Sequence, residues 1–144
     1  MVIKRLALVV ATIAATSMLS ACSTNSTYTG GAVTVLEDQG YYAAIATSSS
    51  EGADALTPAW VVLDANSCWS ITPSDGDDAI PVVWPAGTKI VGGTTLFTSD
   101  QSLSPDEKVT LAGGFVRAGD EYGSSPCIRK TDDVLVAWRV SPDA

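Results

Sequence analysis

From about residue 58 to the C-terminus, short apolar segments alternate with glycine, proline and small polar residues, and this alternation limits the possible folds. Each segment has the length of a strand, whereas a globular helix needs about ten or more residues of apolar periodicity. Short segments at such close spacing are typical of a small all-β barrel or sandwich. We therefore predict an all-β domain with a single core.

Individual strands can be placed from local signals. Residues 60–63 and 68–71 flank the polar stretch 64–67, which predicts a hairpin. Further strands are expected at residues 80–84, 88–91 and 94–97 and, after a single turn at 104–107, at 108–111. The last apolar segment alternates strictly, so we predict that one set of side chains shares one strand face: Val134, Val136, Trp138 and Val140.

The N-terminus has the features of an export signal. Lys4 and Arg5 precede an uncharged apolar run, residues 6–19, and the small residues Ser20 and Ala21 follow it. A run of this length matches the apolar region of a signal peptide, whereas a membrane-spanning helix needs about twenty apolar residues. The sequence therefore predicts that the protein is exported.

Leu19-Ser20-Ala21-Cys22 resembles the lipobox of bacterial lipoproteins. The resemblance implies a signal peptide over residues 1–21, cleavage before Cys22, and attachment of lipid to the Cys22 thiol. Two or three acyl chains hold a protein firmly at a membrane. The alternatives are an ordinary secretory signal with a chance cysteine, and an N-terminal anchor helix that is retained.

The charge of the chain excludes some classes of partner. The full sequence has 16 acidic and 8 basic side chains, a net charge of −8. Cleavage before Cys22 removes two basic residues, which leaves six against sixteen and a net charge of −10. Such a surface repels nucleic acid and anionic headgroups, so we expect no nucleic-acid partner.

With Cys22 carrying lipid, Cys68 and Cys127 are the two cysteines that remain. Export places them in an oxidising compartment, where two thiols in a small domain usually pair, so we predict a disulfide. Closing a loop of this length stabilises the fold by about 4 kcal/mol in the chain-entropy model. The alternative is two unpaired thiols. A metal site is not expected, because the chain has no histidine.

Residues 22–57 are predicted to be the lipidated N-terminus and a flexible tether with a possible extra strand. The stretch 23–32 is small and polar, which favours the tether. Residues 33–36 and 41–46 are strand-like. Whether residues 33–46 join the core is left open by the sequence.

The order of hairpins and turns from residue 58 resembles a small OB-like β-barrel, which we expect over residues 58–144 and stapled by the disulfide. Cys68, VVWPAGT at 82–88, VTLAGGF at 109–115 and Cys127 also resemble a pattern in small uncharacterised bacterial envelope lipoproteins. That group implies no particular activity.

No catalytic motif is present. Without histidine there is no Ser-His-Asp or Cys-His arrangement, and no phosphate- or dinucleotide-binding motif occurs. We expect no enzyme and no cofactor. Most of the four tryptophans should fill the core, and Trp69 and Trp84 are predicted to be the most exposed, because their neighbours are polar or proline. They are the candidate ligand-binding residues.

The sequence therefore favours a protein anchored by lipid to the bacterial cell membrane, with its domain on the extracytoplasmic side. A non-catalytic binding or adaptor role is expected, with another envelope protein as partner. A cell-wall carbohydrate-binding lipoprotein is the alternative, and a small envelope enzyme is the third possibility.

Overall fold

The structure is a computed structural model that describes residues 32–48, 55–73, 78–99, 101–123 and 125–143, together with the backbone of residues 25–30. The expected signal peptide and Cys22 lie outside these residues. The strands are β1 Asn25–Gly30, β2 Val33–Asp38, β3 Tyr41–Ala46, β4 Ala55–Leu63, β5 Trp69–Pro73, β6 Ile80–Trp84, β7 Lys89–Val91, β8 Thr95–Phe97, β9 Ser102–Leu103, β10 Lys108–Arg117 and β11 Asp133–Pro142, and the helix α1 is Gly119–Tyr122.

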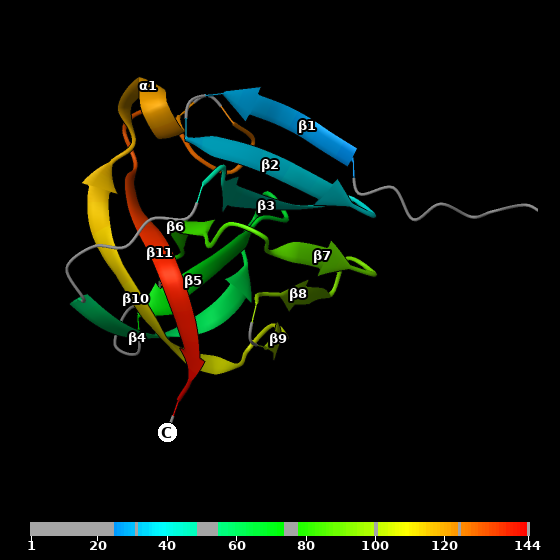
Figure 1. Ribbon diagram of the computed structural model, residues 1–144, viewed down its shortest axis with the longest axis vertical. Coiled ribbons are helices and arrows are strands. Elements are labelled where there is room, and N and C mark those ends of the chain that lie inside the picture. The colour runs from blue at the N-terminus through cyan, green and yellow to red at the C-terminus, as the bar shows by residue number, and fades with distance from the viewer. Residues whose placement is uncertain are drawn as a thin grey trace, which may run out of the picture.

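Five strands close into a barrel (Figure 1). β4 pairs with β5 and with β10, β5 pairs with β6, and β10 pairs with β11, all antiparallel. The barrel closes because β6 and β11 run parallel and pair with each other. This is the strand order of an OB-like barrel, so the predicted fold class is confirmed.

The barrel interior is filled by the two largest fully buried side chains, Trp69 and Trp84. The indole Nε1 of Trp84 donates a hydrogen bond to the backbone oxygen of Trp69, 3.0 Å away. Aliphatic side chains from the other barrel strands, such as Val61, Leu111 and Leu135, complete this core.

Residues 33–46 belong to the fold. β2 and β3 form a hairpin, and β3 pairs in parallel with β6 through Ala44 and Val83. A second core lies between this hairpin, β6, β11 and the β10–β11 connection: Val33, Val35, Ala44, Val83, Ala118, Ile128 and Val134. The boundary expected at residue 58 therefore falls inside β4, and the folded unit begins well before it.

The predicted tether is also shorter than expected. Within the stretch 23–32, Asn25–Gly30 forms β1, which pairs antiparallel with β2. The sheet therefore extends as β1-β2-β3 beyond β6. Small polar residues favour a tether in isolation, but pairing with an existing strand edge supplies the backbone hydrogen bonds that such a segment lacks alone.

Strand β11 contains a bulge that changes which side chains face the core. Ala112 of β10 pairs with Arg139, and the next residue, Gly113, pairs with Ala137, so Trp138 is the extra residue. Leu135 and Ala137 face the barrel core, and Val140, three residues later, faces it too. The prediction that residues 134, 136, 138 and 140 share one face is therefore wrong, because the bulge interrupts the alternation.

The disulfide between Cys68 and Cys127 is confirmed, with a Cα–Cα distance of 5.6 Å. Cys68 follows the β4–β5 turn, and Cys127 lies in the long connection between β10 and β11. The backbone N–H of Tyr42 in β3 donates to the oxygen of Ser67, 2.9 Å away. Three segments that are distant in sequence are therefore joined at this end of the barrel.

Candidate functional site

OB barrels commonly bind ligands on the outer face of their second and third strands and with the loops beside it. The matching strands here are β5 and β6. The outward-facing side chains of Ser70 and Val83 on these strands are buried, because the β2–β3 hairpin and the β10–β11 connection cover them. The Ser70 hydroxyl donates to the carboxylate of Asp64. This face is therefore occupied by the chain itself.

Trp69 and Trp84 do not lie on a binding surface. Their exposed fractions are 1% and 0%, so the prediction that they are the most exposed tryptophans is wrong. The polar neighbour Ser70 indicated exposure, but adjacent residues of a strand point to opposite faces. Ser70 faces outward, and Trp69 therefore faces the core.

The described residues do present a different surface, which we call the β4 row: Leu56, Pro58 and Trp60. These alternate residues of β4 point away from the core, whereas Ala59 and Val61 between and beyond them are buried. Leu56 is 63% exposed and Trp60 is 40% exposed. Because alternate strand residues are about 7 Å apart, the row forms a continuous apolar ridge.

The neighbouring strands extend this surface. The register places Leu56 beside Ala112 and Pro58 beside Thr110. The β11 bulge puts Trp138 and Arg139 together next to Ala112 on the outer side. The Trp138 ring lies over Gly114, where an added Cβ would be 3.8 Å from the ring. The β4 row therefore borders a sheet face that carries a second indole.

Two cationic side chains border the same face. The Lys108 ammonium, beside Trp60 in the register, pairs with the Asp143 carboxylate at 2.8 Å. Arg139 is exposed and forms no ion pair within the described part of the chain. In a protein of strongly negative net charge, this face therefore carries an available positive charge next to an apolar ridge.

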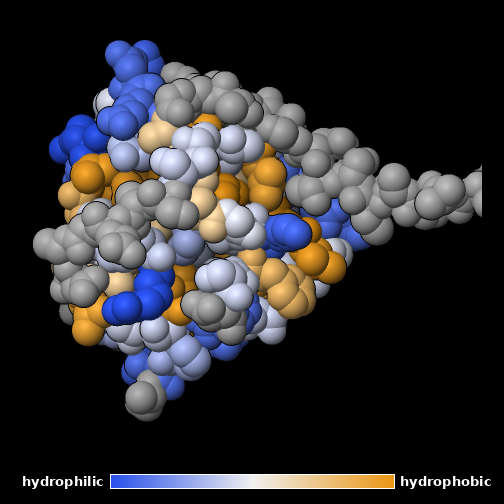
Figure 2. Space-filling model, viewed as in Figure 1, coloured by the Kyte–Doolittle hydropathy of each residue, from blue (hydrophilic) through white to orange (hydrophobic). Residues whose placement is uncertain are grey.

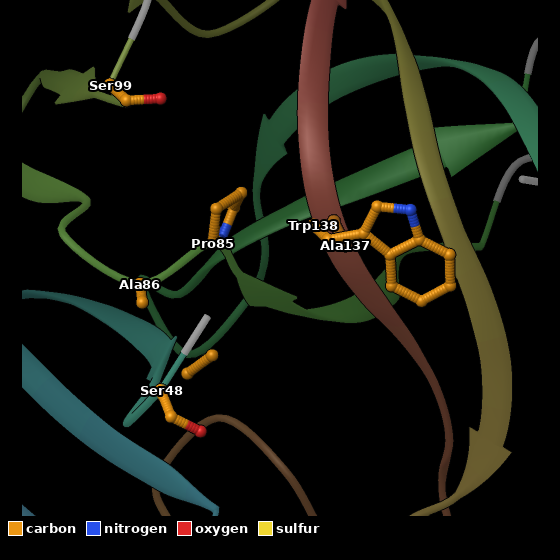
Figure 3. A pocket seen from close by; sticks show the side chains of 7 residues that line it. Ser48, Pro85, Ala86, Ser99, Ala137 and Trp138 are labelled. Carbon is orange, nitrogen blue, oxygen red and sulfur yellow. The ribbon is translucent and has the colours of Figure 1, made fainter. Parts of the chain in front are cut away.

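The principal cavities among the described residues lie elsewhere. One, of about 180 Å³, is lined by Ser48, Pro85, Ala86, Ser99 and the bulge of β11 (Figure 3). Trp138 is among the residues that line it, and the figure shows its ring extending from β11 toward β10, on the side opposite Pro85 and Ala86. Another, of about 810 Å³, is a groove between the end of β2 and β7.

The titratable groups with shifted pKa values do not form an acid–base pair. The hydrogen bond and the charge of Lys130 hold the pKa of Asp120 below its ordinary value. Burial raises the pKa of Tyr122, with the Glu121 carboxylate as a smaller cause. The two groups are thus held as a carboxylate and a neutral phenol. Among the described residues, no cluster of three or more Cys, Asp or Glu side chains is placed to hold a metal ion.

Within the described ranges, no helix has the length and apolar character needed to cross a membrane. No known protein family, curated protein or solved structure matches the chain.

Sequence reasoning missed the β4 row, although a signal was present. In the segment 56–61, apolar residues occupy the positions of both strand faces. Leu56, Pro58 and Trp60 belong to one face, and Ala59 and Val61 belong to the other. A barrel strand buries one face in the interior. An apolar second face then has to be covered by other elements or left exposed.

Proposed function

We propose that this protein is a lipid-anchored component of the bacterial cell envelope with a non-catalytic adaptor role, and that the β4 row binds another envelope protein. The observation that carries the proposal is the exposure of Leu56 and Trp60 on one face of a barrel strand. The four cavities described for the structured part of the chain are lined by other side chains. An exposed apolar surface of this kind fits a protein partner better than a small molecule.

The surface has the properties of an interface centre. Strand β4 pairs with β10 over residues 55–60 and with β5 over residues 59–63. Its backbone is therefore held by neighbouring strands before binding. Tryptophan and arginine are the residues that most often dominate binding energy at interfaces. Trp60 and Arg139 supply one of each, and the surrounding Thr110 and Lys108 supply a polar rim.

The anchoring part of the proposal rests on the lipobox that ends at Cys22. Lipid on this residue would hold the domain at the bacterial cell membrane, facing the extracytoplasmic side. An oxidising compartment agrees with the Cys68–Cys127 disulfide.

Carbohydrate binding is the second candidate, because Trp60 and Trp138 lie on the same outer face. Indole rings present an apolar body on which other flat or apolar groups stack. OB barrels usually bind oligosaccharides on the face that corresponds to β5 and β6. Here the chain covers that face, which argues against glycan binding there. A cell-wall glycan would therefore also have to bind at the β4 row.

The test is photocrosslinking in intact cells, with p-benzoylphenylalanine in place of Pro58. We expect one protein adduct, because Pro58 lies in the middle of the row, and we expect Leu56→Ser with Trp60→Ala to remove it. The control places the same crosslinker at Asn66, which is exposed on the β4–β5 turn. Adducts of equal yield at both positions, or none, would contradict the proposal. An adduct with wall polysaccharide would replace it with glycan binding.

A further inference from the structure

A lipid on Cys22 would lie very close to the folded domain. Strand β1 begins at Asn25, three residues after Cys22. Three residues of extended chain span at most about 10 Å. The first residue of β1 would therefore be held next to the membrane surface, which restricts how the domain is oriented.

The start of β1 and two turns belong to the same end of the domain. In the β1–β2 register, Asn25 lies beside Glu37, directly before the β2–β3 turn. The carboxylate of Asp38 accepts a hydrogen bond from the backbone N–H of Gly93 in the β7–β8 turn, at 2.9 Å. Figure 1 shows the start of β1 and the β7–β8 turn on the right and the start of β4 on the opposite side.

This end carries exposed apolar side chains. Lys89, Val91 and Phe97 share one face of the small sheet β7-β8-β9, because Lys89 pairs with Phe97 and Val91 is two residues from Lys89. We call these three residues the β7–β8 patch. Val91 is 52% exposed and Phe97 is 41% exposed, and apolar atoms gather over β7 and β8 in Figure 2.

The groove of about 810 Å³ adjoins the patch. It runs between the end of β2 and β7, and Leu36, Ile90 and Val91 are among its lining residues. Within the described part of the chain, the Lys89 ammonium forms no ion pair. An apolar surface with one free cation at its border is the combination that suits the boundary between acyl chains and phosphate headgroups.

We infer that the β7–β8 patch docks on the membrane that carries the lipid of Cys22, with Val91 and Phe97 in the interface and the Lys89 ammonium toward the phosphates. This inference rests on the lipidation in the proposed function. Because the anchor already holds the domain at the surface, even a weak contact is formed most of the time. The net negative charge opposes anionic lipid, so apolar contact supplies the attraction.

The nearby carboxylates do not prevent this orientation. Glu37 accepts a hydrogen bond from the backbone N–H of Gly40, and Asp38 accepts the one from Gly93. Both carboxylates are thus directed to backbone donors of the two turns.

The test uses the mature chain, residues 22–144, with the Cys22 thiol coupled to a maleimide phospholipid in phosphatidylcholine vesicles. The coupling places a lipid on the Cys22 thiol, as in the proposed anchored protein, whether or not the cell lipidates this residue. p-Benzoylphenylalanine replaces Val91 in one sample and Val116, an exposed valine of β10, in the control. We expect lipid adducts about tenfold more abundant at position 91, and Phe97→Ser should lower them several-fold.

Equal lipid adducts at positions 91 and 116 would overturn the docking inference. An adduct of position 91 with a protein, when the lipidated chain is crosslinked in cells, would also overturn it and assign the groove to a protein partner. The intact mass of the protein isolated from cells decides the lipidation of Cys22 separately. Failure of the docking and failure of the anchoring are therefore distinguishable.

Discussion

At the scale of single residues, two adjacent glycines of β10 have different roles. A Cβ on Gly113 would lie 2.3 Å from the carbonyl oxygen of Val136, a distance that real side chains do not reach. A Cβ on Gly114 would lie 3.8 Å from the Trp138 ring, an ordinary contact. The close approach at Gly113 occurs where the bulge of β11 brings the two backbones together.

We predict that Gly113→Ala destabilises the protein by about 3 kcal/mol, because β10 and β11 must separate to admit the methyl group. Gly114→Ala is the matched control and should change the free energy of unfolding by about 0.5 kcal/mol or less. Urea unfolding of both variants measures the difference. Equal effects would show that the bulge does not need a glycine at position 113.

The tryptophans provide a second comparison at this scale. Trp84 is fully buried and hydrogen-bonded to the backbone of Trp69, whereas Trp60 lies on the outer surface. Trp84→Ala should cost about 3–5 kcal/mol, because it leaves a cavity in the centre of the barrel. Trp60→Ala should cost about 1 kcal/mol or less. Thermal or urea unfolding checks both values, and similar losses would contradict the assignment of Trp84 to the core.

At the scale of elements, the positions of the hairpins and turns could be predicted from the sequence, whereas the face of each strand that is buried could not. The β4–β5 hairpin and strands β6, β7 and β8 lie where turn residues and apolar segments indicated. Within residues 33–46, the segment 41–46 is apolar at every position, which is typical of a strand that packs on both sides, whereas residues 37–40 are polar or glycine. The sequence alone therefore does not show whether this hairpin joins the core. Its pairing partner, β6, is distant in sequence, so no local signal identifies it.

The β10–β11 connection is the element that depends most on the disulfide. It contains a short helix, and the backbone hydrogen bonds described for it, such as that from Ala118 N–H to the Asp132 oxygen, lie within the connection. Cys127 ties it to Cys68. Replacing both cysteines by serine should lower the free energy of unfolding by about 4 kcal/mol in the chain-entropy model. We also expect faster hydrogen exchange in residues 118–132 than in the oxidised protein.

The same exchange experiment contains its own control. The amides of β4 and β10 pair within the barrel. In the serine variant they should lose only the protection that the lower free energy of unfolding accounts for. A loss of protection in residues 118–132 that is no larger than the loss in β4 and β10 would show that the disulfide stabilises the whole domain and not the connection in particular.

At the scale of the whole molecule, the sequence by itself determined the β class, the absence of histidine chemistry and the one disulfide pairing that remains after Cys22 is set aside. These properties depend on composition and on periodicity along the chain, which are local. The tertiary structure alone decided that Trp69 and Trp84 are buried, that Leu56 and Trp60 are exposed, and that the chain covers the usual OB binding face. A period of two separates the faces of a strand, but which face is buried depends on the strands, bulges and hairpins that distant parts of the chain place against it.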